Sequence, residues 1–185
     1  MELIPAVERN FLERTPPRRA RSRIPLRGGA VVELGISLFF LLLMLFGVVD
    51  FGRALLFRHA LTSMSREAAN LESRGTPMDT TLQSTIENSG AADLAHNGFV
   101  ILSAVARDER GELKITRQVS GGGLPSSSRV GSRSSGQVLL PNDGIPLRGQ
   151  TLYVAEIFVR FESVTPIGAL LHTRLPSVLY DVAYF

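Results

Sequence analysis

Residues 34–49 form one long apolar run, LGISLFFLLLMLFGVV, without a charged side chain. At about 1.5 Å per residue, a helix over this run is roughly 24 Å long, a little less than the bilayer core of about 30 Å. Apolar residues resume at 54–57, beyond Asp50 and Arg53, whose spacing of three favours an ion pair on one helix face at the membrane interface. We therefore predict a transmembrane helix over residues 29–57.

Two other interpretations of the apolar run fit the sequence less well than a membrane span does. A buried helix of a soluble protein rarely lacks a polar face over so many residues. A cleaved secretory signal peptide has a shorter apolar part, about 7–15 residues, which ends at a small-x-small site. This run is longer and leads into an amphipathic helix, so a retained membrane span is the better interpretation.

Basic residues are concentrated before the apolar run. Residues 1–28 contain seven arginines and three glutamates, a charge of +4, so that −1 remains for the rest of a chain whose net charge is +3. This bias predicts a cytoplasmic leader over residues 1–28 and an extracytoplasmic domain over residues 58–185. The near neutrality of that domain argues against nucleic acid as a partner.

The helix is expected to continue beyond the membrane and to end at Gly75-Thr76-Pro77. The apolar positions of this continuation share one face: Phe57, Leu61, Met64, Ala68, Leu71. Its polar residues are expected mostly on other faces: Arg58, Thr62, Ser65, Arg66, Glu72. One helix from about residue 30 to residue 74 would thus carry an apolar stripe that another part of the chain must cover.

Downstream, the hydrophobic pattern predicts a short helix over about 80–96, capped by Asp79 or Thr80. Alternating or fully apolar segments then predict four strands, of which the first is central: 99–106, 113–119, 151–162, 178–184. Strands without long helices between them favour an antiparallel sheet. The fold class is therefore α+β, a lollipop in which a long N-terminal helix, first transmembrane and then amphipathic, packs on a small antiparallel sheet.

The alternation also assigns strand faces. In the second strand Leu113, Ile115 and Val119 are expected on the buried side, and in the third Glu156 is expected on the opposite side. Residues 120–150 hold seven glycines and seven serines, and we expect this span to be a mobile loop that buries little. It lacks the Lys-Ser/Thr pair of a phosphate-binding loop.

Candidate catalytic chemistry is scarce. The chain contains no cysteine, and its three histidines lie far apart at positions 59, 96 and 172, without the spacing of metal ligands. No Gly-x-Ser-x-Gly motif of a serine hydrolase is present. We therefore predict neither a catalytic site nor a metal or cofactor site, and expect a protein that is not an enzyme.

Glu33 stands at the start of the apolar run, shortly after Gly28 and Gly29. A carboxylate at the edge of a membrane helix is costly, and its simplest explanation is hydration at the headgroup boundary. A second explanation is a cut between Gly28 and Gly29, which places the new amino group about 6 Å along the helix from Glu33. The amine of a neighbouring subunit could then neutralise Glu33 in a helical bundle. This arrangement resembles the class III signal peptides of type IV pilins and pseudopilins, which a membrane aspartic peptidase cuts after a glycine.

The region from residue 27 onward resembles the opening of TadE-like proteins, the minor pseudopilins of tight-adherence (Tad) pili. The elements of the resemblance occur in this order: RGGA at 27–30, VE at 32–33, FG at 46–47, DFGRA at 50–54, LT at 61–62 and REAA at 66–69. Together they cover residues 27–70, and a weaker similarity covers 150–185.

The resemblance implies a minor pseudopilin-like component of a Tad-type pilus assembly or secretion system, with a pilin-like fold, in the bacterial inner membrane. Gly28 and Gly29 would form the processing site of a prepilin peptidase, and Glu33 would act in assembly. The other implied partners are pilins or pseudopilins, the inner-membrane pilus platform proteins and the lipid bilayer, and no cofactor is implied. The alternative is a periplasmic binding or sensory module on a single-pass membrane anchor.

Overall fold

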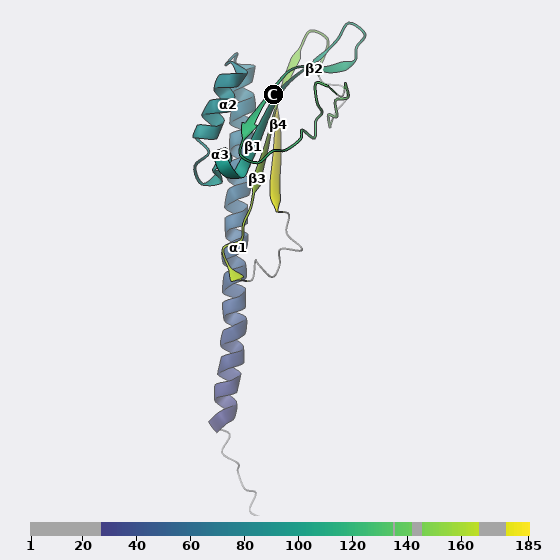
Figure 1. The fold of residues 1–185 in the computed structure, drawn as a ribbon. Coiled ribbons are helices and arrows are strands. Elements are labelled where there is room, and N and C mark those ends of the chain that lie inside the picture. The colour runs from purple at the N-terminus through teal and green to yellow at the C-terminus, as the bar shows by residue number, and fades with distance from the viewer. Residues whose placement is uncertain (1–26, 135, 142–145, 167–176) are drawn as a thin grey trace, which may run out of the picture. The chain divides into compact units, whose positions relative to one another are not determined.

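The structure is a computed structural model that describes residues 27–134, 136–141, 146–166 and 177–185. The chain divides into two units, residues 1–40 and residues 41–185, which are described separately. Helix α1 (Arg27–Ser73) supplies the described part of the first unit and the start of the second. Figure 1 shows the order of the elements along the chain. The predicted leader lies outside the described residues except for its last two positions.

Helix α1 confirms the single long helix predicted from the sequence, because it runs without a break to Ser73. The chain leaves the helix at Gly75, two residues after Ser73, where a φ of +91° is a left-handed conformation that favours glycine. The Gly75 amide donates to the carbonyl of Glu72 and the Thr76 amide donates to that of Leu71. This pair of bonds is a Schellman motif, which satisfies two carbonyls at the end of the helix.

The short helix expected over residues 80–96 is divided into three pieces: α2 (Met78–Glu87), the 3₁₀ turn η1 (Gly90–Ala92) and α3 (Leu94–Asn97). The left-handed backbone of Gly90 and Asp93 interrupts the helix. The predicted cap is also wrong, because α2 begins one residue before Asp79 and has Pro77 at its N-cap without a side-chain bond. The Asp79 carboxylate instead pairs with Arg117, at 2.5 Å.

Four strands form one antiparallel sheet, as predicted: β1 (Gly98–Arg107), β2 (Leu113–Gly122), β3 (Thr151–Arg160) and β4 (Val178–Tyr184). Their order across the sheet is β2-β1-β3-β4, with every neighbouring pair antiparallel. Strand β1 is central and almost wholly buried, in agreement with its apolar sequence on both faces.

One face of the sheet packs against the helices. Its core joins Leu61 and Ala68 of α1, Leu94 of α3 and residues of β1, β3 and β4, with α2 packed at its side (Figure 1). Ser65 and Glu72 are buried in this contact, with 0% and 1% of their surface exposed. The prediction that their side chains lie on other faces of α1 is therefore wrong, and the packed face of the helix is more polar than its stripe indicated.

The opposite face has a smaller core of Val105, Ile115, Val130 and Val154. A β-bulge explains why Ile115 belongs here while Val119 packs on the helix side. The β1–β2 register shifts between Ala104 and Val105, which leaves one extra residue in β2 and reverses the faces beyond it. The expectation that Leu113, Ile115 and Val119 share one face is therefore wrong.

The Gly/Ser-rich span also contributes to this second core, which its composition did not indicate. Val130 is only 2% exposed, and its carbonyl accepts a bond from the Leu139 amide. The Ser128 hydroxyl and the Arg129 amide both donate to the carboxylate of Glu156 in β3. Glu156 lies on the predicted face of β3, but it is fully buried there. The mobility of the whole span remains a prediction.

The packing of α1 on the sheet predicts that replacing Leu61 by alanine lowers the free energy of unfolding by about 3 kcal/mol, because it removes buried apolar surface and leaves a cavity. The matched control is Leu139→Ala, at a leucine that is 70% exposed, where we expect a change below about 0.5 kcal/mol. Chemical unfolding in detergent measures both. Equal effects would contradict the proposed contact between α1 and the sheet.

Candidate functional site

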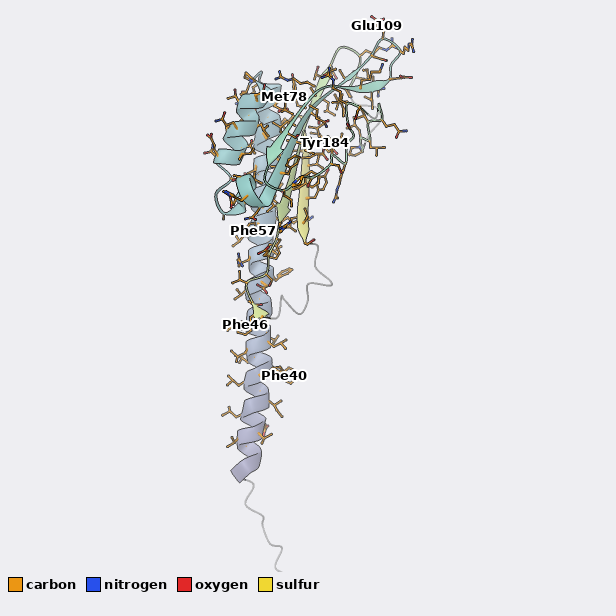
Figure 2. The ribbon with its side chains drawn as sticks, in the orientation of Figure 1. Phe40, Phe46, Phe57, Met78, Glu109 and Tyr184 are labelled. Atoms are coloured by element: carbon orange, nitrogen blue, oxygen red, sulfur yellow. The ribbon has the colours of Figure 1, made fainter. Side chains whose placement is uncertain are left out.

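The first part of α1 is bare. From Gly28 to Val49 its residues are exposed, with Phe46 half-buried, although most of their side chains are apolar. Figure 2 shows Phe40 among the side chains that project from this part of the helix. By length and composition α1 is a candidate membrane span, and it is the only one among the described residues. Lipid is the environment that satisfies such a surface.

Gly28, Gly29 and Glu33 all lie in this bare region. A Cβ atom added to either glycine would meet no atom within 4 Å, and neither glycine has the left-handed backbone that favours this residue. Glycine lowers helix stability, so the local fold gives no reason for two of them in the first turn. Glu33 is exposed and lies one turn after Gly29. Processing at Gly28 and Gly29, and the role of Glu33 in assembly, remain predictions.

Asp50 is a buried residue within the exposed stretch of α1: it is 8% exposed, while Val49 before it is 44% exposed and Phe51 after it is 68% exposed. Its carboxylate accepts bonds from the hydroxyls of Ser163 and Thr165. The amides of Val164 and Thr165 also donate to it, at 3.3 and 3.4 Å. We refer to Asp50 with residues 163–165 as the Asp50 clamp. Bonds to a charged acceptor are among the stronger ones in proteins.

The clamp replaces the partner that the sequence assigned to Asp50. Among the described residues the ion pairs do not include Asp50 with Arg53. The Arg53 guanidinium instead lies 6.0 Å from the centre of the Phe57 ring. Its Nη1 atom is buried and has no acceptor in the described part of the chain. The prediction of an ion pair between Asp50 and Arg53 is thus not confirmed, and the position of both residues at a membrane interface remains a prediction.

A second polar contact joins α1 to the sheet. The hydroxyls of Thr62 and Ser65 donate to the carboxylate of Asp181 in β4, at 3.3 and 2.5 Å. Sequence analysis missed Asp181 and the clamp residues Ser163 and Thr165. Their signal is weak, since small hydroxyl residues and single acids are common on strand ends and exposed helix faces. Asp50, the acid directly after the apolar run, was the signal that could have predicted the clamp, because a buried carboxylate requires several donors.

Glu72 is a buried acid near the end of α1. Neither of its carboxylate oxygens has a hydrogen-bond partner among the described residues. Burial raises the pKa of Glu72 to about 8, although the positive charge of Arg117 acts in the opposite direction. Near neutral pH the side chain is therefore mostly protonated, which is how a protein accommodates an acid that has no buried partner.

The contacts of Asp50 and Asp181 join α1 to the segment after β3 and to β4. The described residues contain no group of three histidines or acids that could hold a metal ion. A hollow of about 270 Å³ lies beside α2, lined by Asp79, Leu82, Gln83, Ile86 and Glu87. Of its two acids, Asp79 is already paired with Arg117. What the fold builds with its polar residues is therefore the attachment of α1 to the sheet.

The clamp predicts that Asp50→Ala lowers the temperature of unfolding, because the donors of residues 163–165 lose a charged acceptor. Glu162→Ala, at an exposed acid beside the clamp, is the matched control and should change stability little. Thermal unfolding in detergent, followed by circular dichroism, compares the two. If both variants unfold at the same temperature as the parent protein, the clamp does not stabilise the fold.

Glu72 predicts a pH dependence of stability. Its pKa is about 8 in the folded chain against 4.5 as the ordinary value, so the folded state binds more protons between these limits. The free energy of unfolding therefore falls as the pH rises from about 4.5 to 8. Glu72→Gln should remove this slope and stabilise the protein at pH 8 by an amount on the order of 2–4 kcal/mol. Glu67→Gln, at an exposed site on the same helix, should keep the parent slope. Parallel profiles for both variants would show that Glu72 does not titrate in this range.

Residues 28–70 match a known protein family. No curated protein and no solved structure matches the chain. The matched region covers less than a quarter of the chain, and it contains the bare part of α1, Glu33, Asp50 and Arg53. Residues 28–70 match the family of TadE-like proteins, which confirms the resemblance predicted from the motifs of this region.

Proposed function

We propose that the protein is a minor pseudopilin-like component of a Tad-type (type IVc) pilus assembly or secretion system, with a structural role and no catalytic one. The observation that carries the proposal is the coincidence of the family match with the bare helix: residues 28–70 hold the paired glycines, Glu33 and the exposed apolar run. TadE-like proteins are associated with pilus assembly, and a helix that is exposed over its first half suits lateral association in a membrane.

The orientation follows from the charges. The arginine-rich leader stays in the cytoplasm, α1 crosses the inner membrane, and the sheet domain faces the periplasm. The prepilin peptidase cuts between Gly28 and Gly29 on the cytoplasmic side. The open space around both glycines supports this, because nothing in the described fold competes with a peptidase for them.

Glu33 acts after the cut. It is exposed on the helix, and lipid is a poor environment for its carboxylate. The new amino group of a neighbouring pilin or pseudopilin neutralises it, and this pairing places the helices of the assembly in register. Platform proteins of the inner membrane and the other pilins are therefore the proposed partners. No contact among the described residues favours the alternative of a periplasmic binding or sensory module.

The proposal predicts that co-expression with the cognate prepilin peptidase removes the leader and changes the net charge from +3 to −1. Gly28→Leu should block the cut, because a peptidase pocket that selects glycine has no space for a side chain. Gly35→Leu is the matched control, since it makes the same change at another glycine of α1 with open space around it. Mass spectrometry of the intact proteins measures the outcome.

Glu33→Gln separates processing from assembly. The cut should still occur, but co-purification of pilus components should fall, because the amine of the partner loses its counter-charge in a medium of low dielectric. An intact leader in the unsubstituted protein, with an active peptidase present, would refute the processing step. The periplasmic binding module would then become the better hypothesis.

A further inference from the structure

Arg53 follows the uncharged apolar run of α1, and the exposed apolar residues Phe51, Leu55 and Leu56 lie around it. The twenty residues from Ala30 to Val49 span about 30 Å as a helix, which is the thickness of a bilayer core. Arg53 is four residues further on, or about 6 Å along the axis. If the bare residues are in lipid, as the proposed function requires, the guanidinium of Arg53 lies at the level of the phospholipid headgroups.

The guanidinium lacks a counter-charge in the described chain. The carboxylate of Asp50, one turn away, already accepts four bonds from residues 163–165. The Nη1 atom of Arg53 is buried but has no acceptor among the described residues. A buried donor of this kind normally has a partner, because the loss of its hydration is costly.

The surroundings of Arg53 hold its side chain in place. Phe57 lies one turn further along α1, with the guanidinium 6.0 Å from its ring centre. The Phe57 ring in turn contacts the ring of Phe161 edge to face, at 5.7 Å. The ring pair and the Asp50 clamp both join α1 to the segment that follows β3, on either side of Arg53 in the sequence of the helix.

We propose that Arg53 binds the phosphate of a phospholipid headgroup at the extracytoplasmic surface of the membrane. The guanidinium offers paired N–H donors that match the oxygens of a phosphate, and it is weakly hydrated, which suits the membrane interface. A lipid phosphate is the acceptor that is present at this depth in every phospholipid bilayer. The proposal rests on the membrane anchoring in the proposed function, but not on processing or on pilus assembly.

The binding fixes the depth of the helix. Arg53 and the Asp50 clamp are at the same level, so a phosphate on Arg53 holds the edge of the sheet domain at the membrane surface. Both the arginine and the clamp are thereby assigned to one boundary between lipid and water. Lysine, a point charge without the planar fork of donors, should replace Arg53 only in part.

The test uses the full chain, expressed without the peptidase, purified in detergent and titrated with phosphatidylglycerol. Native mass spectrometry counts the bound lipid, and thermal unfolding reports the stabilisation that binding gives. We expect Arg53→Gln to bind the lipid about tenfold more weakly and to lose the thermal shift. Arg58→Gln, an equal change of charge at an exposed arginine, should behave like the parent protein. Unfolding without lipid verifies that each variant is folded.

Several results would overturn the proposal. If Arg53→Gln binds the lipid as tightly as the parent protein, Arg53 is not the lipid site. If Arg53→Gln and Arg58→Gln lose affinity equally, the lipid is attracted by the general positive charge and not by a specific site. Competition by inorganic phosphate at the same concentration would indicate a site for free phosphate. If Arg53→Gln binds the lipid like the parent protein but co-purifies fewer pilus proteins from cells, the partner of Arg53 is a carboxylate of another protein. Because the protein is uncut in this experiment, failure of the proposed processing leaves the lipid measurement unaffected.

Discussion

The structure depends on the hydrogen bonds that hold the carboxylate of Asp50, because they join the exposed part of α1 to the sheet domain. An uninterrupted helix satisfies its own backbone bonds, so only its side chains must be matched to their surroundings. Up to Val49 most side chains are bare and apolar, and from Phe57 onward one face packs on the sheet, while Phe51, Leu55 and Leu56 between them are exposed. A buried carboxylate at this point is tolerated because residues 163–165 supply its donors. The segment that follows β3 is thereby tied to the helix.

Polar residues then decide how the sheet sits on the helix. Apolar contacts are not directional, and a stripe of leucine and alanine would tolerate several registers. The bonds from Thr62 and Ser65 to Asp181 permit only one, because each hydroxyl must meet the same carboxylate. On the far face Glu156 performs a similar role for the Gly/Ser-rich span, by accepting bonds from Ser128 and Arg129. A glycine-rich segment can thus be held on a core without many apolar residues of its own.

Much of the fold could be predicted from hydrophobic periodicity, because the long helix and all four strands bury strongly patterned faces. The errors share one physical cause. Periodicity assigns every polar side chain to solvent, and it therefore misplaced Ser65 and Glu72. Ser65 is buried because it bonds to Asp181, and Glu72 can be buried because its raised pKa keeps it protonated. The bulge in β2 is invisible to it as well, since one extra residue reverses the faces without altering the alternation of residue types. The residues of the clamp come from distant parts of the chain, and only the folded structure brings them together.

The charged side chains on the first half of α1 differ in the hydrogen-bond partners that the chain supplies to them. Asp50 has four donors within its own domain, so its role is complete in the single chain. Glu33 is exposed at the opposite end of the bare residues and has no hydrogen bond among the described residues, so in lipid it needs a positive partner from another molecule. Arg53 has a buried donor without an acceptor among the described residues. Asp50 thus serves the fold itself, while the proposed partners of Glu33 and Arg53 lie outside the chain: a protein for the first and the membrane surface for the second.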